Sequence, residues 1–156
     1  RTAASAAEKR KLAVDYIERA HSLSKKLIKN GRHEAAEKIY KDLIERSVYA
    51  DVPFIQRTTF LNELAISKRS RGDYKAALGY CNEALAILEK NGETDSDLPL
   101  TIKITKLQVL LDLNDYDSAF NLFDRVSQRY STESSGLMDS AGLLAVQTKL
   151  LSIWRN

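Results

Sequence analysis

A short turn outline recurs three times along this chain at a nearly constant interval. It stands at Gly31-Arg32-His33, at Gly72-Asp73-Tyr74 41 residues later, and at Asn114-Asp115-Tyr116 a further 42 residues on. Small side chains follow the middle turn at helical spacing, as Ala77 and Cys81 do. Repetition at such an interval indicates stacked helical units, each of which buries an apolar face against the next. The sequence therefore predicts a helical solenoid.

The segments between the turns favour helices. Two prolines and six glycines in 156 residues leave long uninterrupted stretches, and their apolar residues recur at three-and-four spacing. Asp51-Val52-Pro53 and Asp97-Leu98-Pro99 are typical of helix starts, since Asp caps free backbone N–H groups and Pro is tolerated in a first turn. These starts are 46 residues apart, whereas the turns behind them are 42 apart. The third helix is therefore predicted to be about one turn longer at its front end than the fifth.

The predicted fold is all-α, a right-handed superhelix of antiparallel helix pairs with about seven helices in one domain spanning 1–156. Repeats are expected at about 13–47, 52–90 and 98–130, followed by a loop at Ser131–Gly136 and an extra helix at about 137–154. That last helix is too apolar for a polar end cap, and the sequence begins without Met. We therefore expect a fragment of a longer protein.

At these residues the chain resembles the tetratricopeptide repeat (TPR) family, in which large and small apolar residues flank a Gly-x-Tyr turn. The middle unit carries the family's residues at the family's spacings: Leu61, Leu64, Ala65, Gly72, Tyr74, Ala77, Cys81 and Ala84. The other two units match less closely, and Lys68 stands where the family usually has an aromatic residue. A period near 42 exceeds the common length of about 34. It is similar to the extended repeats of kinesin light chains and of several bacterial peptide-sensing regulators.

The sequence offers little catalytic chemistry. It has no Gly-rich phosphate loop, no paired Cys/His spacing and no nucleophile elbow. His21 and His33 lie on different predicted helices without a cysteine nearby, and Cys81 is expected to be a small buried residue and not a nucleophile. We expect no enzymatic activity, no cofactor, no metal and no small-molecule substrate. A single cysteine also favours a reducing, cytoplasmic location, and no apolar run approaches the roughly 18 residues needed to span a bilayer.

The resemblance implies that the first helix of each unit lines a concave groove. The groove positions carried over as partner-binding residues are Lys25, Thr59, Asn62, Ile66, Arg69 and Gln108, and Trp154 of the last helix is added as a further contact. Asn62 and Arg69 lie seven residues apart on one helix face, suited to a peptide backbone and an acidic side chain. Ordinary solvation of these polar residues is the alternative interpretation.

The leading hypothesis is a protein–protein interaction module that binds a peptide or helix of a partner protein. One alternative is a scaffold segment of a larger assembly, which uses its apolar last helix for contacts that include self-association. Another is a peptide-sensing regulatory domain. The basic first third, with twelve Lys/Arg against seven Asp/Glu in residues 1–50, could also face acidic membrane or nucleic acid. Charge runs usually only solvate a helix face, so that contact is not favoured.

Overall fold

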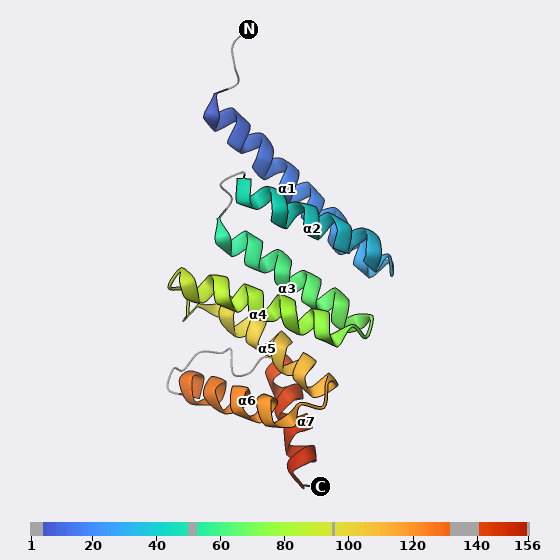
Figure 1. Ribbon diagram of the computed structural model, residues 1–156, viewed down its shortest axis with the longest axis vertical. Coiled ribbons are helices and arrows are strands. Elements are labelled where there is room, and N and C mark those ends of the chain that lie inside the picture. The colour runs from blue at the N-terminus through green and yellow to red at the C-terminus, as the bar shows by residue number, and fades with distance from the viewer. Residues whose placement is uncertain (1–4, 50–52, 95, 132–140, 156) are drawn as a thin grey trace.

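The computed structural model describes residues 5–49, 53–94, 96–131 and 141–155. Seven α-helices and no strand occur within these ranges, which confirms the predicted all-α class. They are α1 (Ala6–Lys29), α2 (His33–Tyr49), α3 (Phe54–Ser70), α4 (Tyr74–Lys90), α5 (Asp97–Asp112), α6 (Tyr116–Ser131) and α7 (Ala141–Arg155). Helices α1 to α6 follow one another along the long axis of the molecule, α7 packs beside α5 and α6, and α1 and the end of α7 lie at opposite poles (Figure 1).

The recurring turn outline is a helix stop followed at once by a helix start. Its first residue has a left-handed backbone in every copy, with φ of 74° at Gly31, 80° at Gly72 and 58° at Asn114. In the middle copy, the N–H of Asp73 donates to the carbonyl of Lys68 at 2.9 Å, which closes the end of α3. The Asp73 carboxylate then accepts from the N–H of Ala76 at 3.3 Å and caps α4. Glycine and asparagine tolerate this left-handed backbone best, which explains why one of them stands at the first position of each turn.

The predicted extra turn at the front of α3 is wrong. α3 has 17 residues and α5 has 16. Pro53 occupies the N-cap of α3, whereas Pro99 lies inside the first turn of α5, which begins at Asp97. The spacing of the two Asp-x-Pro segments therefore does not measure helix length. The predicted capping role of Asp51, the predicted loop beyond Ser131 and the predicted start of the last helix at residue 137 lie outside the described residues.

The core consists of three clusters that repeat along the stack. The first joins α1, α2 and α3 around Ile17, Tyr40, Leu43, Phe60 and Leu64. The second joins α3, α4 and α5, and the third joins α5, α6 and α7. Each helix pair thus buries apolar surface against the pairs on either side, as a solenoid requires.

The middle pair packs through small residues. Ala65, Ala77, Cys81 and Ala84 are completely buried, so the backbones of α3 and α4 approach closely without a cavity. Cys81 is a free thiol, and burial raises its pKa to about 11. The expectation of a small buried cysteine is confirmed.

Candidate functional site

The predicted groove residues of α1 and α3 differ in how open they are. Lys25 is exposed and Ile66 retains 41% of its accessible surface. Thr59 is half-buried, and its hydroxyl donates to the carbonyl of Ile55 at 2.9 Å. Asn62 is only 6% exposed, and its Oδ1 has no hydrogen-bond partner among the described residues. The open surface here is therefore formed by Lys25 and Ile66, with Asn62 behind it.

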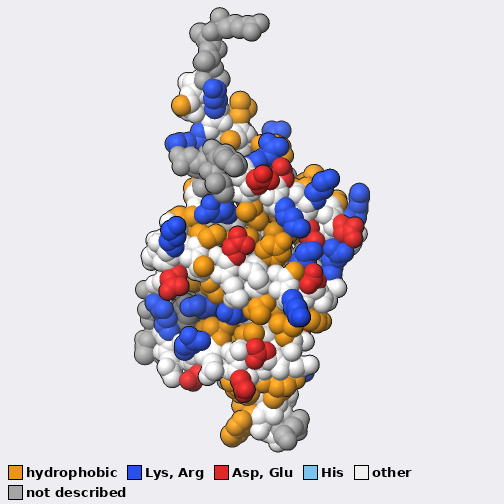
Figure 2. Space-filling model, viewed as in Figure 1, with side chains coloured by type: hydrophobic (Ala, Val, Ile, Leu, Met, Phe, Trp, Pro, Cys, Tyr) orange, Lys and Arg blue, Asp and Glu red, His pale blue; other side chains and the backbone are white. Residues whose placement is uncertain are grey.

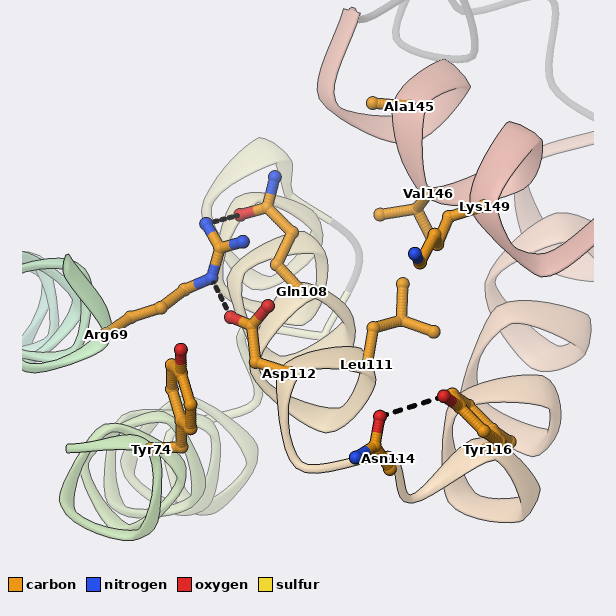
Figure 3. A pocket seen from close by; sticks show the side chains of 10 residues that line it. All are labelled: Arg69, Tyr74, Gln108, Leu111, Asp112, Asn114, Tyr116, Ala145, Val146 and Lys149. Carbon is orange, nitrogen blue, oxygen red and sulfur yellow. Dashed lines mark hydrogen bonds and ion pairs between the residues drawn. The ribbon is translucent and has the colours of Figure 1, made fainter. Parts of the chain in front are cut away.

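Arg69 joins α3 to α5 at the end of these helices. Its Nε donates to the carboxylate of Asp112, and its Nη1 donates to Oε1 of Gln108 at 3.4 Å. Figure 3 shows the guanidinium group held between these two side chains. Two of the predicted residues, Arg69 and Gln108, are thus brought together. Asp112, which compensates the charge of Arg69, was missed because a carboxylate at a helix end gives no groove signal in sequence.

A pocket of about 450 Å³ opens beside this ion pair. Its walls come from α3 to α7: Arg69, Tyr74, Gln108, Leu111, Asp112, Asn114, Tyr116, Ala145, Val146 and Lys149. Leu111 and Val146 lie on the Lys149 side of the pocket, across from the Arg69–Asp112 pair (Figure 3), and polar side chains form most of the exposed lining. Lys149 makes no ion pair within the described part of the chain. The pocket is therefore suited to a group that combines apolar surface with negative charge.

The last helix contributes to the site and also presents a second surface. Leu143, Val146 and Leu150 are buried against α5 and α6. Leu144 and Leu151 are exposed, and Trp154 is 76% exposed. Trp154 does not line the pocket. Of the predicted partner-binding residues, Arg69 and Gln108 line the pocket, whereas Trp154, Lys25, Thr59, Asn62 and Ile66 lie outside it.

A buried charge cluster links the first and second units. Glu37 of α2 is only 4% exposed and lies 2.8 Å from Nζ of Lys68. It also accepts from Arg71 at 3.3 Å and from the hydroxyl of Ser67 at 3.0 Å. Burial alone would raise the pKa of Glu37, but the hydrogen bonds from Lys68, Ser67 and Arg71 outweigh burial and lower it. Lys68, at the position where the family usually has an aromatic residue, pairs with this carboxylate.

The histidines have no metal-binding arrangement in the described ranges. His21 packs edge-on against Tyr40 and Phe60, with ring centroids 5.8 and 5.2 Å away. Burial, and then the charge of Lys25, lowers the pKa of His21. No set of three His, Cys, Asp or Glu side chains among the described residues could hold a metal ion. Across the same residues, each helix is too short or too polar to cross a membrane.

Comparison with known proteins agrees with this architecture. The family model of the tetratricopeptide repeat matches residues 56–132. No curated protein matches the sequence. Among solved structures, BtubC (BKLC) from P. vanneervenii is similar with a TM-score of 0.75 and 19% identity, over 89% of this chain and 55% of that one.

Two structures from Podosopora anserina, of kinesin light chain nearly identical TPR-like repeats, are also similar. Their TM-scores are 0.70 and 0.68, each with 16% identity over 89% of this chain and 65% of theirs. This chain thus spans less than two thirds of the length of each of these three structures. At such identities the likeness shows the fold, and it confirms the predicted resemblance to kinesin light chain-type repeats.

Proposed function

We propose that this chain, whose residues 56–132 match the model of the tetratricopeptide repeat family, is a non-catalytic module that binds a peptide or helix of a partner protein along its concave side. Repeats of this family generally mediate protein–protein interaction. The observation that carries the proposal is the pocket at the junction of α3, α5 and α7. A concave, preformed site in which polar side chains surround a smaller apolar surface binds a ligand with little rearrangement.

In this proposal the partner lies across the first helices of the repeats. Ile66 provides an apolar contact on α3, and Lys25 and Thr59 contact the segment further toward α1. Asn62 lies behind these contacts, because its Oδ1 is buried and out of reach of a partner on the surface. These contacts orient the segment toward the pocket.

The pocket would anchor an acidic side chain of the same segment. Asp112 already compensates Arg69, so Lys149 supplies the uncompensated positive charge. Gln108 adds a neutral donor and acceptor beside the guanidinium group. An acidic residue next to an apolar one is therefore the expected anchor of the partner.

A random-peptide display selection tests this proposal. Peptides selected on the wild-type chain should bind Ile66→Glu and Lys149→Glu at least about tenfold more weakly, since each change removes a contact and adds a repelling charge. Arg69→Gln should also weaken binding. Asp112→Asn is the matched control, because it breaks the same ion pair but leaves the guanidinium group free, and it should preserve or strengthen binding. Equal binding of the peptides by wild type, Ile66→Glu and Lys149→Glu would contradict the proposal that the partner binds in the groove.

A second candidate function rests on a different observation, the exposed apolar face of α7. A scaffold segment of a larger assembly would use Leu144, Leu151 and Trp154 as an interface, including one with a second copy. Sedimentation velocity should then show self-association that Trp154→Glu abolishes. A chain that stays monomeric at all concentrations would exclude an α7 interface with a second copy of the chain.

We place this binding in the cytoplasm. The one cysteine, Cys81, is buried as a free thiol, which suits a reducing compartment. Fractionation of cells that express the chain with a small tag would test this location.

A further inference from the structure

Helix α1 lies at one end of the stack (Figure 1) and is covered much less than the inner helices. Only two of its 24 residues, Ile17 and Ser24, are buried, whereas α3 buries seven of its 17 residues. The reason is that α3 packs against α2 on one side and α4 on the other, while α1 packs against α2. One side of α1 is therefore left without a neighbouring helix among the described residues.

The uncovered side of α1 carries a stripe of three exposed apolar side chains. Leu12, Tyr16 and Leu23 follow one another at intervals of four and seven residues, which places them on one side of the helix. Their exposed fractions are 67%, 48% and 51%. At 1.5 Å per residue the stripe is about 16 Å long. Three large apolar side chains in one row are typical of an interaction surface, in contrast to apolar residues that are exposed singly.

The stripe is held in place by contacts with α2. The hydroxyl of Tyr16 donates to Oδ2 of Asp42 at 3.5 Å, and the guanidinium group of Arg46 lies 5.3 Å from the centre of the Tyr16 ring. Nε of Arg46 also pairs with Asp42 at 2.8 Å. The surface is therefore preformed, and the charge of Asp42 is already compensated by its neighbour on α2.

Positive charge exceeds negative charge along α1, which has seven Lys and Arg against three Asp and Glu. Three exposed cations stand three or four residues from a member of the stripe: Lys9, Arg19 and Lys26. None of them forms an ion pair within the described part of the chain. The carboxylates at the same spacing are Glu8, which caps the start of the helix, and the half-buried Asp15. Figure 2 shows Lys and Arg beside hydrophobic side chains on the described surface nearest the N-terminus.

We propose that the stripe of Leu12, Tyr16 and Leu23 docks an amphipathic helix of a partner protein whose flanks carry Asp or Glu. The helix would be about three turns long, to match the stripe, and its apolar face would cover the stripe as a neighbouring helix of the stack would. Its carboxylates would pair with the three exposed cations, which select an acidic partner over a basic one. The groove proposed above uses none of these residues, so this surface is a separate one.

The charges disfavour a second copy of the chain as the occupant. The other exposed apolar face, on α7, carries Lys149 and Arg155 and no carboxylate. Contact of α1 with α7 of another copy, or with a second α1, would therefore bring like charges together.

A bilayer surface also fits the stripe less well than a helix does. An interfacial helix sinks about 5–10 Å into the boundary between headgroups and acyl chains. Tyr16 is instead held on α2, and Asp15 beside the stripe would face anionic headgroups.

A selection with displayed helical peptides tests the proposal on the full chain. The peptides are about four turns long and alanine-rich, with leucine fixed at three-and-four spacing and the flanking positions randomised among Glu, Gln and Lys. Selection on wild type, with removal of peptides that bind Leu12→Gln/Leu23→Gln, should enrich Glu at the flanks. Enrichment of Lys, or failure to recover a peptide that prefers wild type to the double variant, would overturn the proposal.

Variants place the selected helix on the stripe. Leu12→Gln/Leu23→Gln should weaken its binding at least about tenfold in a calorimetric titration, since two apolar contacts are lost. Leu151→Gln is the matched control, because it removes an exposed leucine from α7, and it should bind as wild type does. Ile66→Glu, in the groove, should also leave this binding unchanged. Equal weakening by Leu151→Gln or by Ile66→Glu would place the helix elsewhere and contradict the assignment.

The charge requirement and the membrane alternative have tests of their own. Arg19→Gln/Lys26→Gln should weaken binding of the selected helix and reduce its dependence on salt, whereas Lys75→Gln on the exposed side of α4 should do neither. Unchanged salt dependence in the double variant would contradict the role of these cations. Vesicles of phosphatidylserine and phosphatidylcholine should not sediment the chain. Sedimentation that Leu12→Gln/Leu23→Gln abolishes would assign the stripe to a membrane surface and overturn the proposal.

Discussion

In both the α3–α4 pair and the α1–α2 pair the same kind of turn joins the two helices, but the packing between the helices differs. The α3–α4 pair buries Ala65, Ala77, Cys81 and Ala84 completely. The α1–α2 pair instead relies on larger side chains such as Tyr40 and leaves much of α1 open: Leu12 is 67% exposed, and Tyr16 and Leu23 are also exposed. Leu12, Tyr16 and Leu23 satisfy the helical spacing of an apolar face without being buried.

The joint between these two pairs is also unlike the rest of the stack. Glu37 of α2 is buried and bound by Lys68 and Arg71 from the end of α3. The middle pair thus depends on close packing, which is sensitive to volume, whereas its joint to the first pair depends on charge. Substitutions that change volume and substitutions that change charge should therefore affect different parts of the molecule.

The largest effect is expected from volume in the middle pair. Ala77→Leu inserts three carbon atoms into a site with no free surface and should lower the free energy of unfolding by about 3 kcal/mol. Ala86→Leu, on the exposed side of the same helix, is the control and should change it by less than about 0.5 kcal/mol. Urea unfolding measures both. A small effect of Ala77→Leu would mean that α3 and α4 do not pack closely.

Charge removal at the joint should have the next largest effect. Glu37→Gln removes the anion that Lys68 and Arg71 share, and we expect a loss of about 2 kcal/mol because both cations are partly solvated. Glu63→Gln is a matched control of the same chemistry. Burial raises the pKa of Glu63 against the opposing charge of Lys25, so neutralising it should be neutral or stabilising. Equal losses from both variants would contradict the role given to the joint.

The same joint predicts the acid response of the chain. The pKa of folded Glu37 lies below its usual value of 4.5, so its stabilising effect is present above that pH and is lost as the pH falls through the lower, folded value. The difference in unfolding free energy between wild type and Glu37→Gln should therefore narrow below about pH 4.5. A difference that stays constant down to acid unfolding would show that Glu37 is not preferentially ionised in the folded chain.

The smallest loss of stability is expected from a substitution in the turn that joins the helices of a pair. Gly72 has φ of 80°, so Gly72→Ala should cost about 1 kcal/mol through backbone strain, although a Cβ there would meet no neighbour. Asn114→Gly, at the equivalent left-handed position, should not reduce stability by this route. Thermal unfolding compares the two. A neutral Gly72→Ala would argue against the left-handed turn.

Much of the fold follows from local sequence signals. The three left-handed turn residues and the small residues beside the middle turn indicate paired helices and their order. The length of α3 was predicted wrongly because Pro53 and Pro99 take different places in their helices. Helical spacing alone could not show that Leu12 and Leu23 are exposed, since burial depends on which helices lie nearby.

The candidate site was predictable only in part, for a similar reason. Arg69, Gln108 and Ile66 lie on the helices that the family resemblance selects. Asp112 and Lys149 come from a helix end and from the last helix, and only the tertiary arrangement brings them to the pocket. Asn62 lies on the predicted helix face but is buried. Its separation of seven residues from Arg69 places both on one face and does not indicate how exposed each side chain is.

The most direct test of the central proposal is to map backbone amide chemical shifts of the chain while a selected peptide is added. Binding on the concave side should move the signals of Ile66, Arg69, Gln108 and Lys149, with smaller changes along α1. The same titration on Ile66→Glu should leave these signals in place. Changes confined to α2, α4 and α6 would contradict the account, because they would place the partner on the second helices of the repeats.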